Sequence, residues 1–136
     1  MTKYDGTCDC GNVKVTAEIA DPTSGIICHC GECKIRYGPY NVVFAVPEND
    51  YKVVSGADSL KTWSYTGASG NPVPCSFCSN CGVNLFRKEA TLPGLTVVIA
   101  STLVKGWESG ELRPTQSLLT HRALPWISEV GTFKQL

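Results

Sequence analysis

The sequence predicts a mainly β protein, and three observations lead to this prediction. Short runs rich in β-branched and aromatic residues recur along the chain, separated by clusters of glycine, proline, asparagine and serine. No window of about eleven residues keeps the apolar period of a helix. The length of 136 residues suits one ordinary domain, and because no linker or internal repeat interrupts the chain, we expect a single domain over residues 1–136.

The first expected strand covers residues 12–19, where apolar residues alternate with mostly polar ones, as a half-buried strand requires. Further strands are expected, in chain order, over residues 40–46, 51–55, 60–65, 83–87 and 95–101. The segments 47–50, 67–72 and 92–94 between them have the composition of turns. One short helical turn is expected over residues 30–37, because Gly38 and Pro39 would end it.

Composition excludes several classes of function. Twelve basic and 12 acidic side chains give a net charge of zero, so we expect no nucleic-acid partner. No apolar run approaches the roughly 20 residues of a membrane-spanning helix, and the first residues lack the features of a signal peptide, so we expect no membrane partner. We therefore expect the protein in the cytoplasm. Because this compartment is reducing, the eight cysteines are interpreted as metal ligands rather than as disulfides.

A pair of cysteines with zinc-knuckle spacing lies in the second half of the chain. Cys78 and Cys81 are separated by two residues and followed by Gly82, which can adopt the positive φ that such a turn needs. A closed structural zinc site has four ligands, and the simplest second pair is Cys8 and Cys10, just before the first expected strand. The spacing therefore predicts one zinc ion held by four thiolates.

A second cluster offers three thiolates within six residues, at Cys28, Cys30 and Cys33. Three protein ligands leave a zinc ion with an open position, which is typical of catalytic sites and suits an incoming thiol. Cys75 is the alternative fourth ligand, and it would convert this site into a second closed structural centre. His29 lies between two of these cysteines and is expected to donate a hydrogen bond near the metal rather than to bind it.

The order of these motifs resembles a known family. C-x-C-G, then C-H-C-x-x-C-K, then F-C-x-x-C-G, and finally R-x-x-P-W follow one another between Gly6 and Ile127. This pattern is similar to that of the glutathione-dependent formaldehyde-activating enzyme (GFA) family, the centromere protein V/GFA type of domain. The resemblance implies a β-tent fold, in which antiparallel sheets carry a structural zinc site.

The resemblance also implies site residues and an activity. The structural zinc falls on Cys8, Cys10, Cys78 and Cys81, and the substrate-side zinc falls on Cys28, Cys30 and Cys33, which act in catalysis as its ligands. The implied reaction joins glutathione, as a cosubstrate, to formaldehyde and is of the carbon–sulfur lyase type. Two zinc ions per chain and a small-molecule thiol or thiol adduct as partner follow from this assignment.

Lys34, Arg36 and Arg122 are the cations expected to bind an anionic substrate, and Arg87 is a further cation that could reach the cluster. One residue departs from the family pattern, because Cys75 stands where the family commonly has an arginine before F-C-x-x-C-G. Two alternatives stay open: a non-catalytic zinc scaffold with two closed four-cysteine sites, and a redox sensor. The sequence is also compatible with a homo-oligomer.

Overall fold

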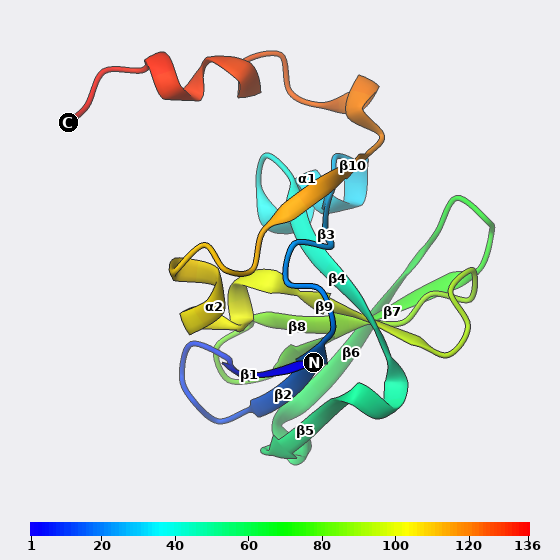
Figure 1. Cartoon of the computed structure of the whole chain (residues 1–136). Helices are drawn as coiled ribbons and strands as arrows, with labels where there is room; N and C mark the ends of the chain where they lie inside the picture. Colours follow the sequence, from blue (N-terminus) through cyan, green and yellow to red (C-terminus); the bar gives the residue numbers. More distant parts are fainter.

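The computed structural model describes residues 1–136 and confirms the mainly β class. Figure 1 shows strands as most of the regular structure, with two short α-helices beside them. The strands are β1 (Thr2–Thr7), β2 (Lys14–Ile19), β3 (Gly25–Cys28), β4 (Asn41–Pro47), β5 (Tyr51–Ser55), β6 (Leu60–Thr66), β7 (Pro72–Cys78), β8 (Asn84–Arg87), β9 (Leu95–Ile99) and β10 (Pro114–Leu118). The helices are α1 (Gly31–Tyr37) and α2 (Val104–Glu108), and short 3-10 turns are formed by Glu48–Asp50, Ala57–Ser59, Ala100–Thr102, Thr120–Arg122 and Ile127–Thr132.

Two sheets form the body of the protein. Strands β1, β2 and β5 make a three-stranded antiparallel sheet, and the seven-stranded sheet has the order β10-β3-β4-β9-β8-β7-β6. All neighbours in the larger sheet are antiparallel except β10, which pairs parallel to β3 at one edge. Val15 and Ala17 of the first sheet are fully buried in one core cluster with Phe44, Leu85 and Val98 of the second. Burial of these apolar side chains is the main force that joins the two sheets.

The six strands that the sequence predicts are present as β2, β4, β5, β6, β8 and β9. The strand expected up to residue 101 ends at Ile99, where the chain enters a 3-10 turn. The expected helical turn is α1, with Cys30 as its N-cap. Strands β1, β3, β7 and β10 and helix α2 are structure that the sequence pattern did not predict.

After β10 the chain leaves the sheets, and Figure 1 shows its last turns running away from the body to the C-terminus. Trp126 and Phe133 pack on each other in this segment, with ring centroids 6.4 Å apart, and both stay about half exposed. None of the helices is both long enough and apolar enough to cross a membrane.

Candidate metal centres and the adjoining pocket

Two turns bring four cysteines from distant parts of the chain together. The sulfur atoms lie within 4.8 Å of one another and belong to Cys8, Cys10, Cys78 and Cys81. The turn after β1 and the turn after β7 have matching backbone bonds: the N–H of the leading cysteine donates to the carbonyl five residues later, at 3.1 Å in the first turn and 3.0 Å in the second. Gly11 and Gly82 follow the second cysteine of each turn with φ of 80° and 81°, a conformation that favours glycine.

The four-cysteine group fits a tetrahedral zinc ion. Zinc–sulfur bonds of about 2.3 Å place neighbouring sulfur atoms about 3.8 Å apart in a tetrahedron. The Cys8–Cys10 and Cys10–Cys78 sulfur distances are 3.6 Å and 3.7 Å. Backbone N–H groups of Cys10 and Val83 lower the pKa of Cys81 to about 6, and the N–H of Val13 donates to the sulfur of Cys8 at 3.2 Å. These donors stabilise thiolates, the form that binds metal.

The second group lies where β3 ends and α1 begins. Cys28 is the last residue of β3, Cys30 is the N-cap of α1, and Cys33 lies in the first turn of the helix, with all three sulfur atoms within 4.8 Å. The Cys33 thiol donates to Cys28, which lowers the pKa of Cys28 and raises that of Cys33. The all-sulfur donor set fits zinc but leaves it one ligand short of four. His29 is buried, its ring lies roughly perpendicular to that of Tyr40 at a centroid distance of 5.7 Å, and its Nδ1 has no hydrogen-bond partner.

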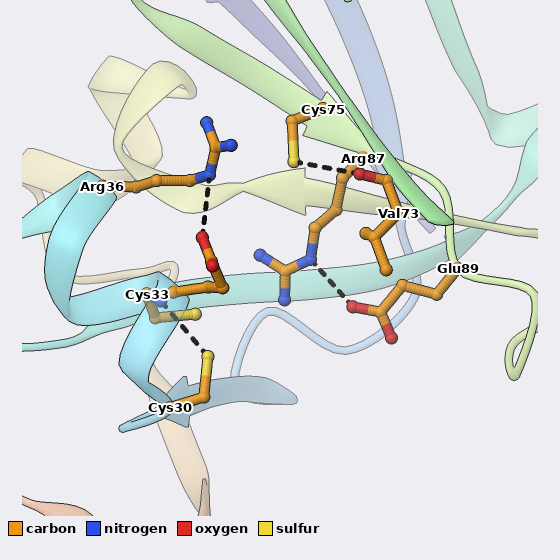
Figure 2. A network of polar contacts seen from close by, with 8 residues as sticks. Cys30, Cys33, Arg36, Val73, Cys75, Arg87 and Glu89 are labelled. Carbon is orange, nitrogen blue, oxygen red and sulfur yellow. Dashed lines mark hydrogen bonds and ion pairs between the residues drawn. The ribbon is translucent and has the colours of Figure 1, made fainter. Parts of the chain in front are cut away.

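Cys75 does not complete the three-cysteine group. Its sulfur is not among the atoms that lie within 4.8 Å of one another, and it contacts the carbonyl oxygen of Val73 at 3.7 Å instead. Only 1% of Cys75 is exposed, and burial raises the pKa of its thiol. Figure 2 shows its side chain on β7, directed toward the same region as Arg36 and Arg87. In this structure the second group therefore consists of three cysteines, and Cys75 lies outside it.

A pocket of about 560 Å³ adjoins the three-cysteine group, and Cys28 and Cys30 are part of its wall. None of the four cysteines of the other group lines it. Most of the remaining wall is apolar. It comes from strands of the large sheet, the β6–β7 hairpin, the β8–β9 loop and the segment after β10, and it includes Ile26, Val43, Val73, Val97, Leu92, Leu118 and Leu119. The pocket is within the size range of small-molecule sites.

Arg87, which is buried, and Glu89, which is partly exposed, form an ion pair at this pocket. The side chain of Arg87 at the end of β8 is 7% exposed, and its Nε donates to Oε1 of Glu89 at 2.9 Å (Figure 2). Burial by itself would lower the pKa of Arg87, but the nearby sulfur of Cys33 and the Glu89 carboxylate hold it above its ordinary value. Arg87 therefore stays cationic beside the three-cysteine group.

Replacing Glu89 with glutamine is expected to lower the free energy of unfolding by about 1–3 kcal/mol, because Arg87 would stay buried without an anionic partner. Chemical denaturation followed by circular dichroism measures this change. Glu48→Gln is the matched control, because Glu48 pairs with Lys88 at the same 2.9 Å but on the surface. Glu48→Gln should lower the free energy of unfolding by less than about 1 kcal/mol. Equal decreases in the free energy of unfolding of the two variants would show that burial does not make the Arg87–Glu89 pair more important for stability.

The three predicted substrate cations have different surroundings. Lys34 donates its Nζ to the backbone carbonyl of Arg122 at 2.7 Å and so fixes the segment after β10. The Arg36 side chain is 16% exposed, lies 3.9 Å from Glu32 and stacks over the ring of Tyr65, and it does not line the pocket. Only Arg122 lines the pocket.

The end of β10 and the segment after it form a pocket wall, of which the sequence predicted only Arg122. Leu118 and Leu119 line the pocket with exposed fractions of 54% and 42%. Leu119 has a φ of 55°, the one positive φ outside glycine. No pattern in the sequence marks this leucine, since left-handed positions are expected at glycine or asparagine.

Comparison with known proteins gives a family and a solved structure. A family model described as "Glutathione-dependent formaldehyde-activating enzyme" matches residues 3–122. A crystal structure of a protein from Rhodobacter sphaeroides is similar to this chain, with a TM-score of 0.64 and 26% sequence identity. The match covers 84% of this chain and 100% of that one.

Proposed function

The chain belongs to the glutathione-dependent formaldehyde-activating enzyme family, and from this premise we propose that it is a zinc-dependent enzyme of the carbon–sulfur lyase type. Its substrate would be the adduct of a thiol, such as glutathione, with an aldehyde or related electrophile. The proposal includes two zinc ions per chain, one on Cys8, Cys10, Cys78 and Cys81 and one on Cys28, Cys30 and Cys33. The eight free cysteines suit the cytoplasm, where we place the protein.

One observation carries this proposal: the group with three cysteines opens into the pocket, and the group with four does not. A metal with four protein ligands has no position for a substrate, whereas three leave one free. Cys28 and Cys30 present the incomplete group to a cavity that can hold a small molecule. The two groups therefore suit different roles, one structural and one catalytic.

The residues of the pocket would bind the reactants and hold them in position. In the direction of adduct formation, the thiol loses its proton and its sulfur forms a bond to the carbonyl carbon. The carbon–oxygen double bond becomes single, and the oxygen takes up a proton, so that no proton is gained or lost overall. Zinc on the three thiolates would stabilise the thiolate form of the substrate at neutral pH. The apolar walls would limit access of water, and the Arg87 cation beside the cysteines would offset their negative charge.

Arg122 is the residue that would bind an anionic group of the thiol. The guanidinium of Arg122 lies against Gly31, the first residue of α1, which follows Cys30 in the chain. A β-carbon at position 31 would be only 3.1 Å from a guanidinium nitrogen of Arg122. Glu89 neutralises Arg87, whereas Arg122 forms none of the three ion pairs of the structure. Its charge is therefore available to a carboxylate of the substrate.

Arg122→Gln is expected to raise KM for the glutathione–formaldehyde adduct by about tenfold, with a smaller change in kcat, because one charge-assisted contact is lost. Steady-state kinetics on the zinc-loaded protein measures both constants. Arg113→Gln is the control, because Arg113 is exposed and does not line the pocket. An unchanged KM in Arg122→Gln would remove this residue from substrate binding.

A further inference from the structure

Leu119 combines an unfavourable backbone conformation with an exposed apolar side chain. Its φ of 55° and ψ of 41° are left-handed, a region in which a residue with a β-carbon is less stable than in the right-handed one. The side chain is nevertheless 42% exposed, so the strain does not serve to bury it in the core. Such strained positions cluster at ligand sites, where the surrounding structure holds them in place.

The neighbouring contacts hold Leu119 in this conformation. The N–H of His29 donates to the carbonyl of Leu118 at 3.2 Å, and the N–H of Arg122 donates to the carbonyl of Leu119 at 2.8 Å. Lys34 adds its 2.7 Å bond to the carbonyl of Arg122. The segment is thus tied on one side of Leu119 to His29, which follows β3, and on the other side to α1, and these bonds fix the backbone that places Leu119 at the pocket.

Leu119 extends an apolar surface that the sheet already provides. Ile26, Val43 and Val97 line the same pocket from β3, β4 and β9, and Leu118 lies next to Leu119 with 54% of its surface exposed. The single carbon of formaldehyde needs only a small part of about 560 Å³. Apolar walls that remain open to solvent gain stability when a hydrocarbon covers them.

The charges of the pocket do not match those of a whole glutathione molecule. Glutathione carries two carboxylates and an ammonium group, and each needs a polar partner once it leaves water. Four charged residues line the pocket, of which Arg87 and Glu89 neutralise each other. Glu32 lies 3.9 Å from Arg36, which leaves Arg122 as the cation without an ion-pair partner. The wall around it is mostly apolar and suits a hydrocarbon.

We propose that Leu119 and Leu118 form, with the apolar strands of the sheet, a subsite for a hydrocarbon chain or ring on the electrophile-derived part of the substrate. This inference rests on the proposed function, because it assumes that the substrate sulfur binds at the three-cysteine centre and that the hydrocarbon is attached to this sulfur. Leu119 is then a specificity-determining residue, and Arg122 receives the anionic group of the thiol part. The preferred substrates are adducts of larger, apolar aldehydes, which bind more tightly than the formaldehyde adduct.

Two inert ligands test the subsite without any turnover: the S-hexyl and S-methyl thioethers of mercaptoacetate. Titration calorimetry on the zinc-loaded protein should show the hexyl ligand binding at least about tenfold tighter, since it covers more apolar surface. Equal affinities would overturn the subsite. The thioethers lack the oxygen that an aldehyde would contribute, so the enzyme cannot cleave them and only binding is measured. If the protein had no lyase activity, the proposed function would be refuted, but the difference in affinity between the two thioethers would still stand.

Substitutions at Leu119 separate a binding role from a structural one. Leu119→Gly should reduce the preference for the hexyl ligand to about threefold or less, while the Tm stays within about 3 °C of the parent value, because glycine accepts the left-handed backbone. Leu119→Met should keep the preference, since it retains an apolar side chain. A fall in Tm with an unchanged preference would overturn the role of Leu119. Leu118→Asn, in the same wall, should also reduce the preference, and this result does not depend on the folding of the glycine variant.

Discussion

Replacing Cys78 with serine is expected to leave the protein unfolded under conditions in which the parent is folded. Cys78 is fully buried, ends β7 and belongs to the group that joins the β1–β2 turn to the β7–β8 turn. Binding of a structural zinc ion contributes about 10–16 kcal/mol in small zinc domains, as much as the whole stability of an ordinary domain. Loss of one ligand in four removes much of this contribution. Thermal unfolding by circular dichroism and zinc content by elemental analysis measure the effect.

Cys75→Ser is a matched control for this variant. Cys75 lies on the same strand, is equally inaccessible with 1% of its surface exposed, and is not part of either sulfur group. Serine at this position costs about 1–3 kcal/mol for a buried hydroxyl, which can still donate to the carbonyl of Val73. The control should therefore fold and keep its zinc. Equal stability and equal zinc content in both variants would show that Cys78 does not bind a structural metal.

Cys30→Ser is expected to abolish activity and reduce the zinc content from about two ions per chain to about one, with the fold retained. The fold survives because the Cys30 sulfur also caps α1, accepting from the N–H of Cys33 at 3.2 Å, and serine is a favourable N-cap. A serine hydroxyl is a poor substitute for a thiolate as a zinc ligand. The variant thus separates the loss of the metal from the loss of the helix.

Zinc content of Cys30→Ser and Cys75→Ser distinguishes the readings of the second centre. Retention of the second zinc in Cys75→Ser, together with its loss in Cys30→Ser, supports a centre with three protein ligands. Loss of the second zinc in both variants would mean that Cys75 moves to become a ligand, and the centre would then be structural. One zinc ion per chain in the parent itself would contradict the two-zinc proposal.

The sequence predicted those strands whose burial follows from their own residue pattern. Strand β2 alternates apolar and mostly polar residues because one of its faces packs on the core. Strand β7 lacks such a signal, because Pro72 and Pro74 resemble turn residues. The carbonyl of Pro74 accepts from the N–H of Lys88, so its nitrogen also faces the β8 side, beyond the last residue of that strand. Because β8 has ended at this point, Pro74 removes at most the last bond between the two strands, and proline is tolerated there.

The candidate site was predicted as far as it depends on local spacing. The three cysteines of the second group lie within six residues, and their helix follows from Cys30 as cap and Gly38 as its end. The pocket depends instead on the parallel pairing of β10 with β3, which brings Leu118 opposite Cys28. Such pairing joins segments about 90 residues apart, and nothing in either segment specifies it. Arg122 was predicted as a cation that could reach the cluster, and Leu119 was not predicted.

The pairing of the first two cysteines with the last two has a consequence for synthesis on the ribosome. Cys10 and Cys78 are 68 residues apart, so at about 5–20 residues per second the first pair waits roughly 3–14 s for its partners. Cys28 follows Cys10 by only 18 residues, and the shorter loop favours a zinc ion shared between these early cysteines by about 1 kcal/mol. We expect the nascent chain to bind metal first in this wrong combination. The mature arrangement would then arise by ligand exchange, driven by the core that closes around Cys78.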